Sequence, residues 1–85
     1  MIVKVKKKVI EDAVNKLLSY DPFPQGIWIL IYGTTLQLIS QSRNGDIYSV
    51  VEHNTIEHNT QVLFANAEDV DIKEETEDIM VLEFP

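Results

Sequence analysis

Six consecutive apolar residues, Ile27 to Tyr32, stand between Gly26 and Gly33. A run of this length between glycines is typical of a β-strand that is covered on both faces. A chain of 85 residues forms one small domain, with a single helix available to cover that strand. We therefore expect the second face to lie under the C-terminal segment or in a homodimer interface built on Trp28, Leu30 and Tyr32.

The helix is predicted over residues 8–20. Ile10, Ala13, Val14, Leu17 and Leu18 recur at the spacing of one buried stripe, and Pro22 prevents the helix from continuing. Alternating or apolar segments predict further strands at residues 2–6, 34–42, 47–51, 61–65 and 79–84. Asn44-Gly45 predicts a hairpin turn, because both residue types tolerate a positive φ.

These elements predict an α+β domain over residues 1–85. We expect a single, mostly antiparallel sheet of about five to six strands and one N-terminal amphipathic helix, in the order β-α-β-β-β-β-β. An acidic segment at 66–78 has few apolar anchors and is predicted to form a loop or a turn of helix.

The charge is distributed unevenly along the chain. Residues 68–85 contain eight acids and one base, whereas residues 1–67 contain six of each, so the last eighteen residues hold the whole net charge of −7. A field of one sign repels nucleic acid and attracts basic surfaces. We expect a basic nucleic-acid-binding protein as the partner, and no direct contact with nucleic acid.

Seven carboxylates are the candidate partner-binding residues: Glu68, Asp69, Asp71, Glu74, Glu75, Glu77 and Asp78. Two interpretations remain open. The acids form either a solvated loop that keeps a small protein soluble or a recognition surface that presents negative charge as a duplex presents phosphates. A basic N-terminal segment is expected to lie near them, with Lys4 or Lys6 facing Glu83 across a strand pair.

Catalytic chemistry has few candidates in this sequence. Cysteine is absent, and the three glycines are scattered, so neither a thiolate site nor a glycine-rich phosphate loop is expected. His53 and His58 stand in a repeated Glu-His-Asn-Thr context, but their spacing fits no standard zinc pattern. We expect no enzyme activity, no catalytic residue, no cofactor and no metal; a metal site on the two histidines is the alternative that metal content would test.

The longest apolar run, residues 26–33, is too short to cross a bilayer, and the N-terminus has no apolar core of signal-peptide length. A cytoplasmic location without membrane contact is therefore expected. Because small domains often need a second copy to complete their core, a homodimer is expected as well.

In size, acidity, lack of cysteine and expected architecture, the chain resembles the small DNA-mimic inhibitors that phages make against host DNA-binding proteins. The acids from Glu68 to Asp78 carry this resemblance. It implies a viral inhibitor that acts in the host cytoplasm by occupying the partner's nucleic-acid site. An assembly protein that homo-oligomerises through its apolar strand is the alternative.

A second resemblance is to one repeat unit of the DNA sliding clamps. Residues 1–18 followed by 26–52 have the clamp unit's sequence of a short strand, an amphipathic helix and glycine-punctuated strands. This resemblance implies a clamp-like accessory unit, although a clamp needs a basic lining around DNA and this chain has an acidic excess.

Overall fold

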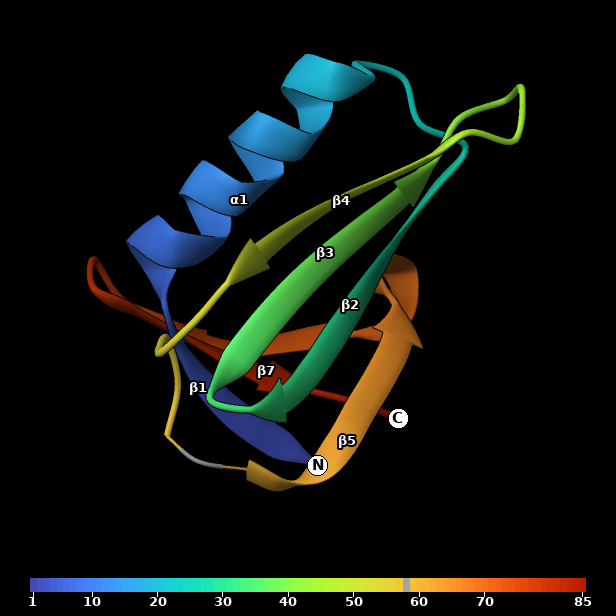
Figure 1. The fold of residues 1–85 in the computed structure, drawn as a ribbon. Helices are drawn as coiled ribbons and strands as arrows, with labels where there is room; N and C mark the ends of the chain where they lie inside the picture. Colours follow the sequence, from blue (N-terminus) through green and yellow to red (C-terminus); the bar gives the residue numbers. More distant parts are fainter. Residues whose placement is uncertain (58) are drawn as a thin grey trace.

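A computed structural model describes residues 1–57 and 59–85 of the chain. Within these residues, the elements in chain order are β1 (Ile2–Lys6), α1 (Lys7–Tyr20), β2 (Gly26–Gly33), β3 (Thr35–Gln41), β4 (Ile47–Glu52), β5 (Asn59–Asn66), the 3-10 turn η1 (Ala67–Asp69), β6 (Asp71–Glu75) and β7 (Ile79–Glu83). Figure 1 shows their arrangement. The predicted helix and all the predicted strands are present.

The strands form two antiparallel sheets. A four-stranded sheet has the order β4-β3-β2-β5, and a three-stranded sheet has the order β1-β7-β6. The α+β class is confirmed, but the single sheet of five to six strands is wrong, because the described residues contain seven strands in two sheets.

The chain changes sheet at η1. The side-chain oxygen of Asn66 accepts a hydrogen bond from the Glu68 amide at 2.9 Å and so caps this turn. β6 then pairs with β7 instead of continuing beside β5. The segment predicted to be a loop or a turn of helix therefore contains a short 3-10 turn and an edge strand.

α1 and the three-stranded sheet pack on the same face of the four-stranded sheet (Figure 1). The core receives side chains from both sheets and the helix: Val3, Val5, Ala13, Leu17, Ile31, Leu36, Leu38, Val50, Leu63, Ala65, Met80, Leu82 and Phe84. Ala13 and Leu17 are fully buried, and Ile10 and Val14 pack beside them. The predicted helix stripe is therefore confirmed.

The β3–β4 hairpin confirms the prediction from Asn44-Gly45, but only Gly45 has a positive φ, at 89°. The Gly45 amide donates to the Ser42 carbonyl at 3.0 Å, and the Asp46 amide donates to Ser42 Oγ at 3.0 Å. Gly45 is therefore the last residue of a tight turn that begins at Ser42.

The N-terminal strand is held to the C-terminal segment at both ends. The Phe84 amide donates to the Met1 carbonyl at 2.7 Å, and the Lys7 amide donates to the Asp78 carbonyl at 2.9 Å. The second bond satisfies a free amide at the first residue of α1, where Lys6 provides no side-chain cap. In the described part of the chain, no helix is long and apolar enough to cross a membrane.

Candidate functional site

The face of the four-stranded sheet that points away from the core is the first candidate surface, and we call it the outer face. In the register, Trp28 lies opposite Ile39, and Leu30 lies between Gln37 and Phe64. Strand alternation then places the following residues on it: Trp28, Leu30, Tyr32, Thr35, Gln37, Ile39, Gln41, Ile47, Ser49, Val51, Val62, Phe64 and Asn66.

The outer face exposes large apolar side chains. Phe64 is 59% exposed, Val62 69% and Ile47 61%, while Tyr32 and Val51 are each 39% exposed. Isolated exposed apolar residues are normal on protein surfaces, whereas a contiguous patch marks a binding site or an aggregation hazard. These five residues lie on one face of one sheet, with residues of β3 between those of β4 and those of β2 and β5.

The prediction that the Ile27–Tyr32 strand is covered on both faces is wrong for the single chain. Ile27, Ile29 and Ile31 point into the core, but Trp28 and Leu30 are only half-buried and Tyr32 is exposed. The C-terminal strand β7 contributes Met80 and Leu82 to the core side. It therefore leaves the outer face open.

Gly26 allows Trp28 to lie flat along its own strand. A Cβ atom at Gly26 would stand 2.8 Å from Cη2 of the indole ring. The glycine therefore leaves room for the ring close to the sheet, which contributes to the partial burial of Trp28.

The outer face contains no charged residue. None of the chain's 14 acids and 7 lysines and arginines stands at the positions named above. The residues predicted as an oligomer interface, Trp28, Leu30 and Tyr32, thus lie together in a neutral apolar surface. Sequence reasoning missed Phe64 and Val62, although their alternation with Leu63 and Ala65 contains the signal.

The second candidate surface is the acidic ridge, which we define as the seven predicted carboxylates. They lie on η1 (Glu68, Asp69), on β6 (Asp71, Glu74, Glu75) and in the turn between β6 and β7 (Glu77, Asp78), and all seven residues are exposed. β6 is an edge strand of the three-stranded sheet. The structure thus places these acids along one edge, on elements with defined backbone geometry.

Within the described part of the chain, one ridge carboxylate has a cationic partner. Glu75 Oε2 accepts a hydrogen bond from Lys7 Nζ at 2.9 Å. This bond raises the pKa of the Lys7 ammonium above its usual value of 10.5; partial desolvation acts against the rise, and the charges of Glu75 and Glu11 add to it. The other six ridge carboxylates remain available to a partner.

The predicted pairing of Lys4 or Lys6 with Glu83 is wrong. β1 and β7 are neighbours as expected, but the register places Ile2 opposite Glu83, with Lys4 opposite Val81. Glu83 is approached instead by Lys73 from β6, at 3.4 Å. The edge lysine thus offsets the like charges of Glu83 and Asp71, which lie directly opposite each other.

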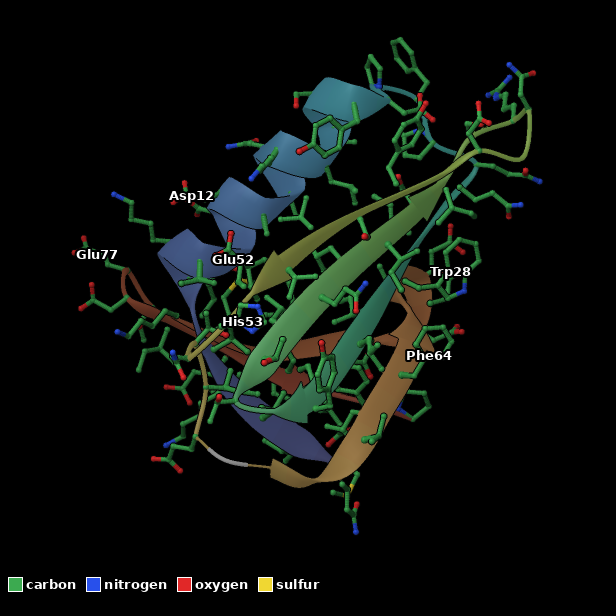
Figure 2. The ribbon with its side chains drawn as sticks, viewed as in Figure 1. Asp12, Trp28, Glu52, His53, Phe64 and Glu77 are labelled. Atoms are coloured by element: carbon green, nitrogen blue, oxygen red, sulfur yellow. The ribbon has the colours of Figure 1, made fainter. Side chains whose placement is uncertain are left out.

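Most of the acidic ridge lies away from the outer face, but η1, which carries Glu68 and Asp69, directly follows β5 and contacts β2. In Figure 2, Trp28 and Phe64 project from one side of the fold, and Glu77 lies at the far end of the β6–β7 hairpin on the other side. The ridge strand β6 belongs to the three-stranded sheet, which packs behind the four-stranded sheet. The acids of β6 and of the β6–β7 turn are therefore apart from the neutral apolar surface, whereas the two acids of η1 adjoin it.

His53 is exposed, and its Nδ1 lies 3.3 Å from the hydroxyl of Thr35. His58, its counterpart in the repeat, lies outside the described residues. Among residues 1–57 and 59–85, no group of three or more metal-ligating side chains comes together.

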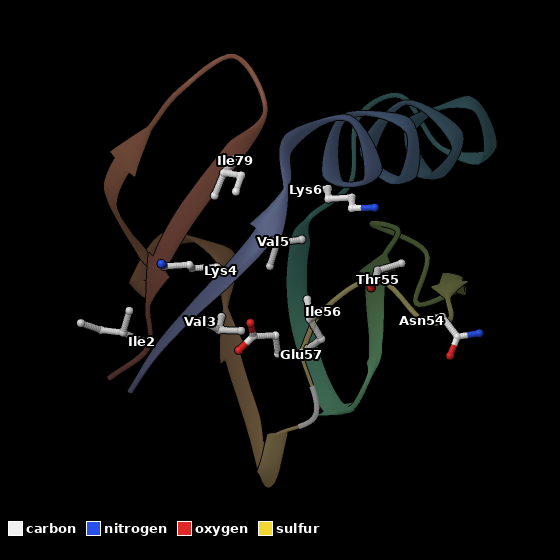
Figure 3. A pocket seen from close by; sticks show the side chains of 10 residues that line it. All are labelled: Ile2, Val3, Lys4, Val5, Lys6, Asn54, Thr55, Ile56, Glu57 and Ile79. Atoms are coloured by element: carbon white, nitrogen blue, oxygen red, sulfur yellow. The ribbon is translucent and has the colours of Figure 1, made fainter.

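A hollow of about 670 Å³ opens beside β1 (Figure 3). The β4–β5 connector forms its other wall through Thr55, Ile56 and Glu57, and Lys4 and Lys6 belong to its β1 side. Its remaining lining is mostly apolar, and Glu57 contributes the one carboxylate among its lining residues. Glu57 lies on the connector wall and the two lysines lie on the β1 wall, so the lining contains both signs of charge.

Comparison with protein-family models, with curated proteins and with solved structures found no match for this chain.

Proposed function

We propose that the chain is a non-enzymatic binding module that occupies the basic, nucleic-acid-binding surface of a partner protein in the cytoplasm. The observation that carries this proposal is the acidic ridge, whose seven carboxylates follow one exposed edge and have, in the described part of the chain, a single cationic partner. An edge of this kind is complementary in charge to the groove in which a basic protein holds phosphates.

The ridge imitates the charge of a nucleic acid only in part. From Asp71 to Glu75, β6 rises about 13 Å and carries three acids and Lys73. Duplex DNA carries one charge per about 1.7 Å, so the same length of duplex would present about eight. We therefore expect the ridge to replace a few phosphate contacts and to bind in a salt-sensitive manner.

The test uses purified chain as bait in a bacterial lysate at low salt, followed by elution with duplex DNA. A triple variant, Asp71→Asn with Glu74→Gln and Glu77→Gln, removes three ridge charges and leaves the Lys7–Glu75 pair intact. We expect it to lose the proteins that DNA displaces from the unmodified chain.

The matched control removes the same number of charges away from the ridge, in the variant Asp12→Asn with Asp46→Asn and Glu57→Gln. These three residues are exposed and lie away from the ridge, on α1, in the β3–β4 turn and in the β4–β5 connector. If both variants lose the captured proteins equally, net charge and not the ridge is responsible, and the proposal fails. It also fails if DNA displaces nothing from the unmodified chain.

A second candidate function, an assembly protein, is favoured by the neutral outer face. Under this function, the acids act only to keep the protein soluble, and both triple variants should behave like the unmodified chain.

A further inference from the structure

We infer that the outer face is a homodimer interface, in which the four-stranded sheets of two copies pack against each other about a two-fold axis. This inference rests on the outer face alone, so it stands or falls independently of the acidic ridge. It extends the sequence expectation from Trp28, Leu30 and Tyr32 to a surface that crosses all four strands.

The charge distribution favours a second copy as the occupant. Two copies with a net charge of −7 each repel one another, and a face without ionised groups is where they can meet at the least electrostatic cost. Five of the seven ridge carboxylates lie on β6 or in the β6–β7 turn, outside the four-stranded sheet, whereas Glu68 and Asp69 lie on η1 beside β2. A charged partner would find no complementary group on this face, and the overall charge disfavours an anionic membrane.

The self-complementarity required by a two-fold interface is available here. Each copy presents aromatic and β-branched side chains together with neutral amides, so Phe64, Ile39 and Gln37 can meet the same kinds of side chain across the axis. Sheets that pack in this way lie about 10 Å apart, with their strands rotated by about 30°. No ion would be buried in such a contact.

The area of the face indicates the size of the expected interface. Four strands that are about 4.8 Å apart and about 20 Å long give a flat footprint of about 400 Å² per copy. Side chains that project from the sheet add to this area. Two copies would therefore bury roughly 1,000 Å² in total, the lower end of specific interfaces. We expect a reversible dimer with a dissociation constant in the micromolar range.

The experiment is sedimentation equilibrium of the purified chain from about 5 µM to about 500 µM, a range that spans the expected dissociation constant. The unmodified chain should convert from monomer to dimer across this range. The emission of Trp28, the only tryptophan, should shift to shorter wavelength over the same range as the indole loses water.

The interface variant is Phe64→Glu, which introduces charge at an exposed position and should keep the chain monomeric throughout. The matched control is Ile2→Glu, because Ile2 is 62% exposed and lies on the other sheet; it should dimerise like the unmodified chain. A second interface variant, Val62→Lys, tests the same face with the opposite charge and also serves if Phe64→Glu fails to fold.

A chain that remains monomeric at the highest concentration overturns the inference. So does a dimer that both interface variants retain, or one that Ile2→Glu also abolishes. Higher-order aggregation without a dimer plateau likewise overturns it. Phe64→Glu leaves the ridge intact, so the proposed function predicts that this variant still captures the proteins that DNA displaces. The lysate experiment with Phe64→Glu therefore tests the proposed function separately from the dimer.

Discussion

Lys7 Nζ lies 2.9 Å from Oε2 of Glu75, joining the first residue of α1 to the edge strand β6. Lys7 and Lys8 occupy the first turn of the helix, where the positive end of the helix dipole disfavours cations. The Glu75 carboxylate supplies the negative charge that this helix terminus lacks in its own sequence. One member of the acidic ridge thus has a structural role, which is why the ridge variants retain it.

Replacing Glu75 by Gln should lower the stability of the fold at neutral pH. Because the folded-state pKa of Lys7 is raised above 10.5, the pair stabilises the fold fully below that pH, and this contribution is lost as pH rises through the folded-state value. Urea unfolding of both proteins at pH 7, 9 and 11 should show a difference that shrinks only at pH 11. Glu74→Gln, a neighbour without a cationic partner, is the control, and a difference that persists at pH 11 contradicts the assignment.

Ser40→Ala should stabilise the protein by about 1 kcal/mol, because it removes a buried hydroxyl that lacks a hydrogen-bond partner. Ser40 is fully buried on the core side of β3, and its Oγ has no partner among the described residues. The free energy of unfolding in urea measures the effect. Ser49→Ala, at an exposed position on β4, should change it by less than about 0.5 kcal/mol. A destabilised Ser40→Ala would show that the hydroxyl is satisfied in solution.

Gly45→Ala should destabilise the β3–β4 hairpin by about 1–2 kcal/mol, the cost of a left-handed backbone for a residue with a Cβ atom. Gly45 has a φ of 89°, and a Cβ added there would meet no atom within 4 Å, so the cost is conformational and not steric. Gly45→Asn should cost less, because asparagine tolerates a positive φ. Equal losses for the two variants would mean that the turn adopts another conformation in solution.

Gly26→Ala should displace the indole ring of Trp28 from its position along β2. The added Cβ would stand 2.8 Å from Cη2, so the ring must shift, and we expect it to move toward solvent. Trp28 emission should therefore shift to longer wavelength at low protein concentration, with the far-ultraviolet circular dichroism unchanged. Ser49→Ala, on the same face, should leave the emission unchanged. An unaltered spectrum for Gly26→Ala would contradict the close contact.

The sequence predicted local structure well, because the relevant signals are local. The stripe that includes Ala13 and Leu17 placed the helix, and Asn44-Gly45 placed a hairpin. The strand β6 was missed because its residues, Asp71 to Glu75, have little strand propensity. It exists through pairing with β7 and not through its own composition. The division into two sheets was also missed, because it depends on which strands pair and not on the composition of any one strand.

The candidate surfaces were predicted unevenly. Trp28, Leu30 and Tyr32 do share a face, as strand periodicity requires. Their complete burial was expected because a continuous apolar run was assumed to have a covering layer on both faces of the strand. Apolar residues also occupy surfaces, so such a run does not by itself reveal a covering layer. The acids were easily found from the sequence, whereas their edge position depended on strand order, which no local pattern encodes.

The pairing of Ile2 with Glu83 also has a consequence for the order of folding during synthesis. The ribosome releases β1 before any of the other elements, yet its strand partner β7 follows the whole four-stranded sheet in the chain. The apolar side chains of Val3 and Val5 therefore stay without their β7 neighbours until β7 has emerged from the ribosome. Closure of the three-stranded sheet across this long loop is thus expected to be a late step of folding, and a pause in translation before Ile79 would leave the nascent chain exposed.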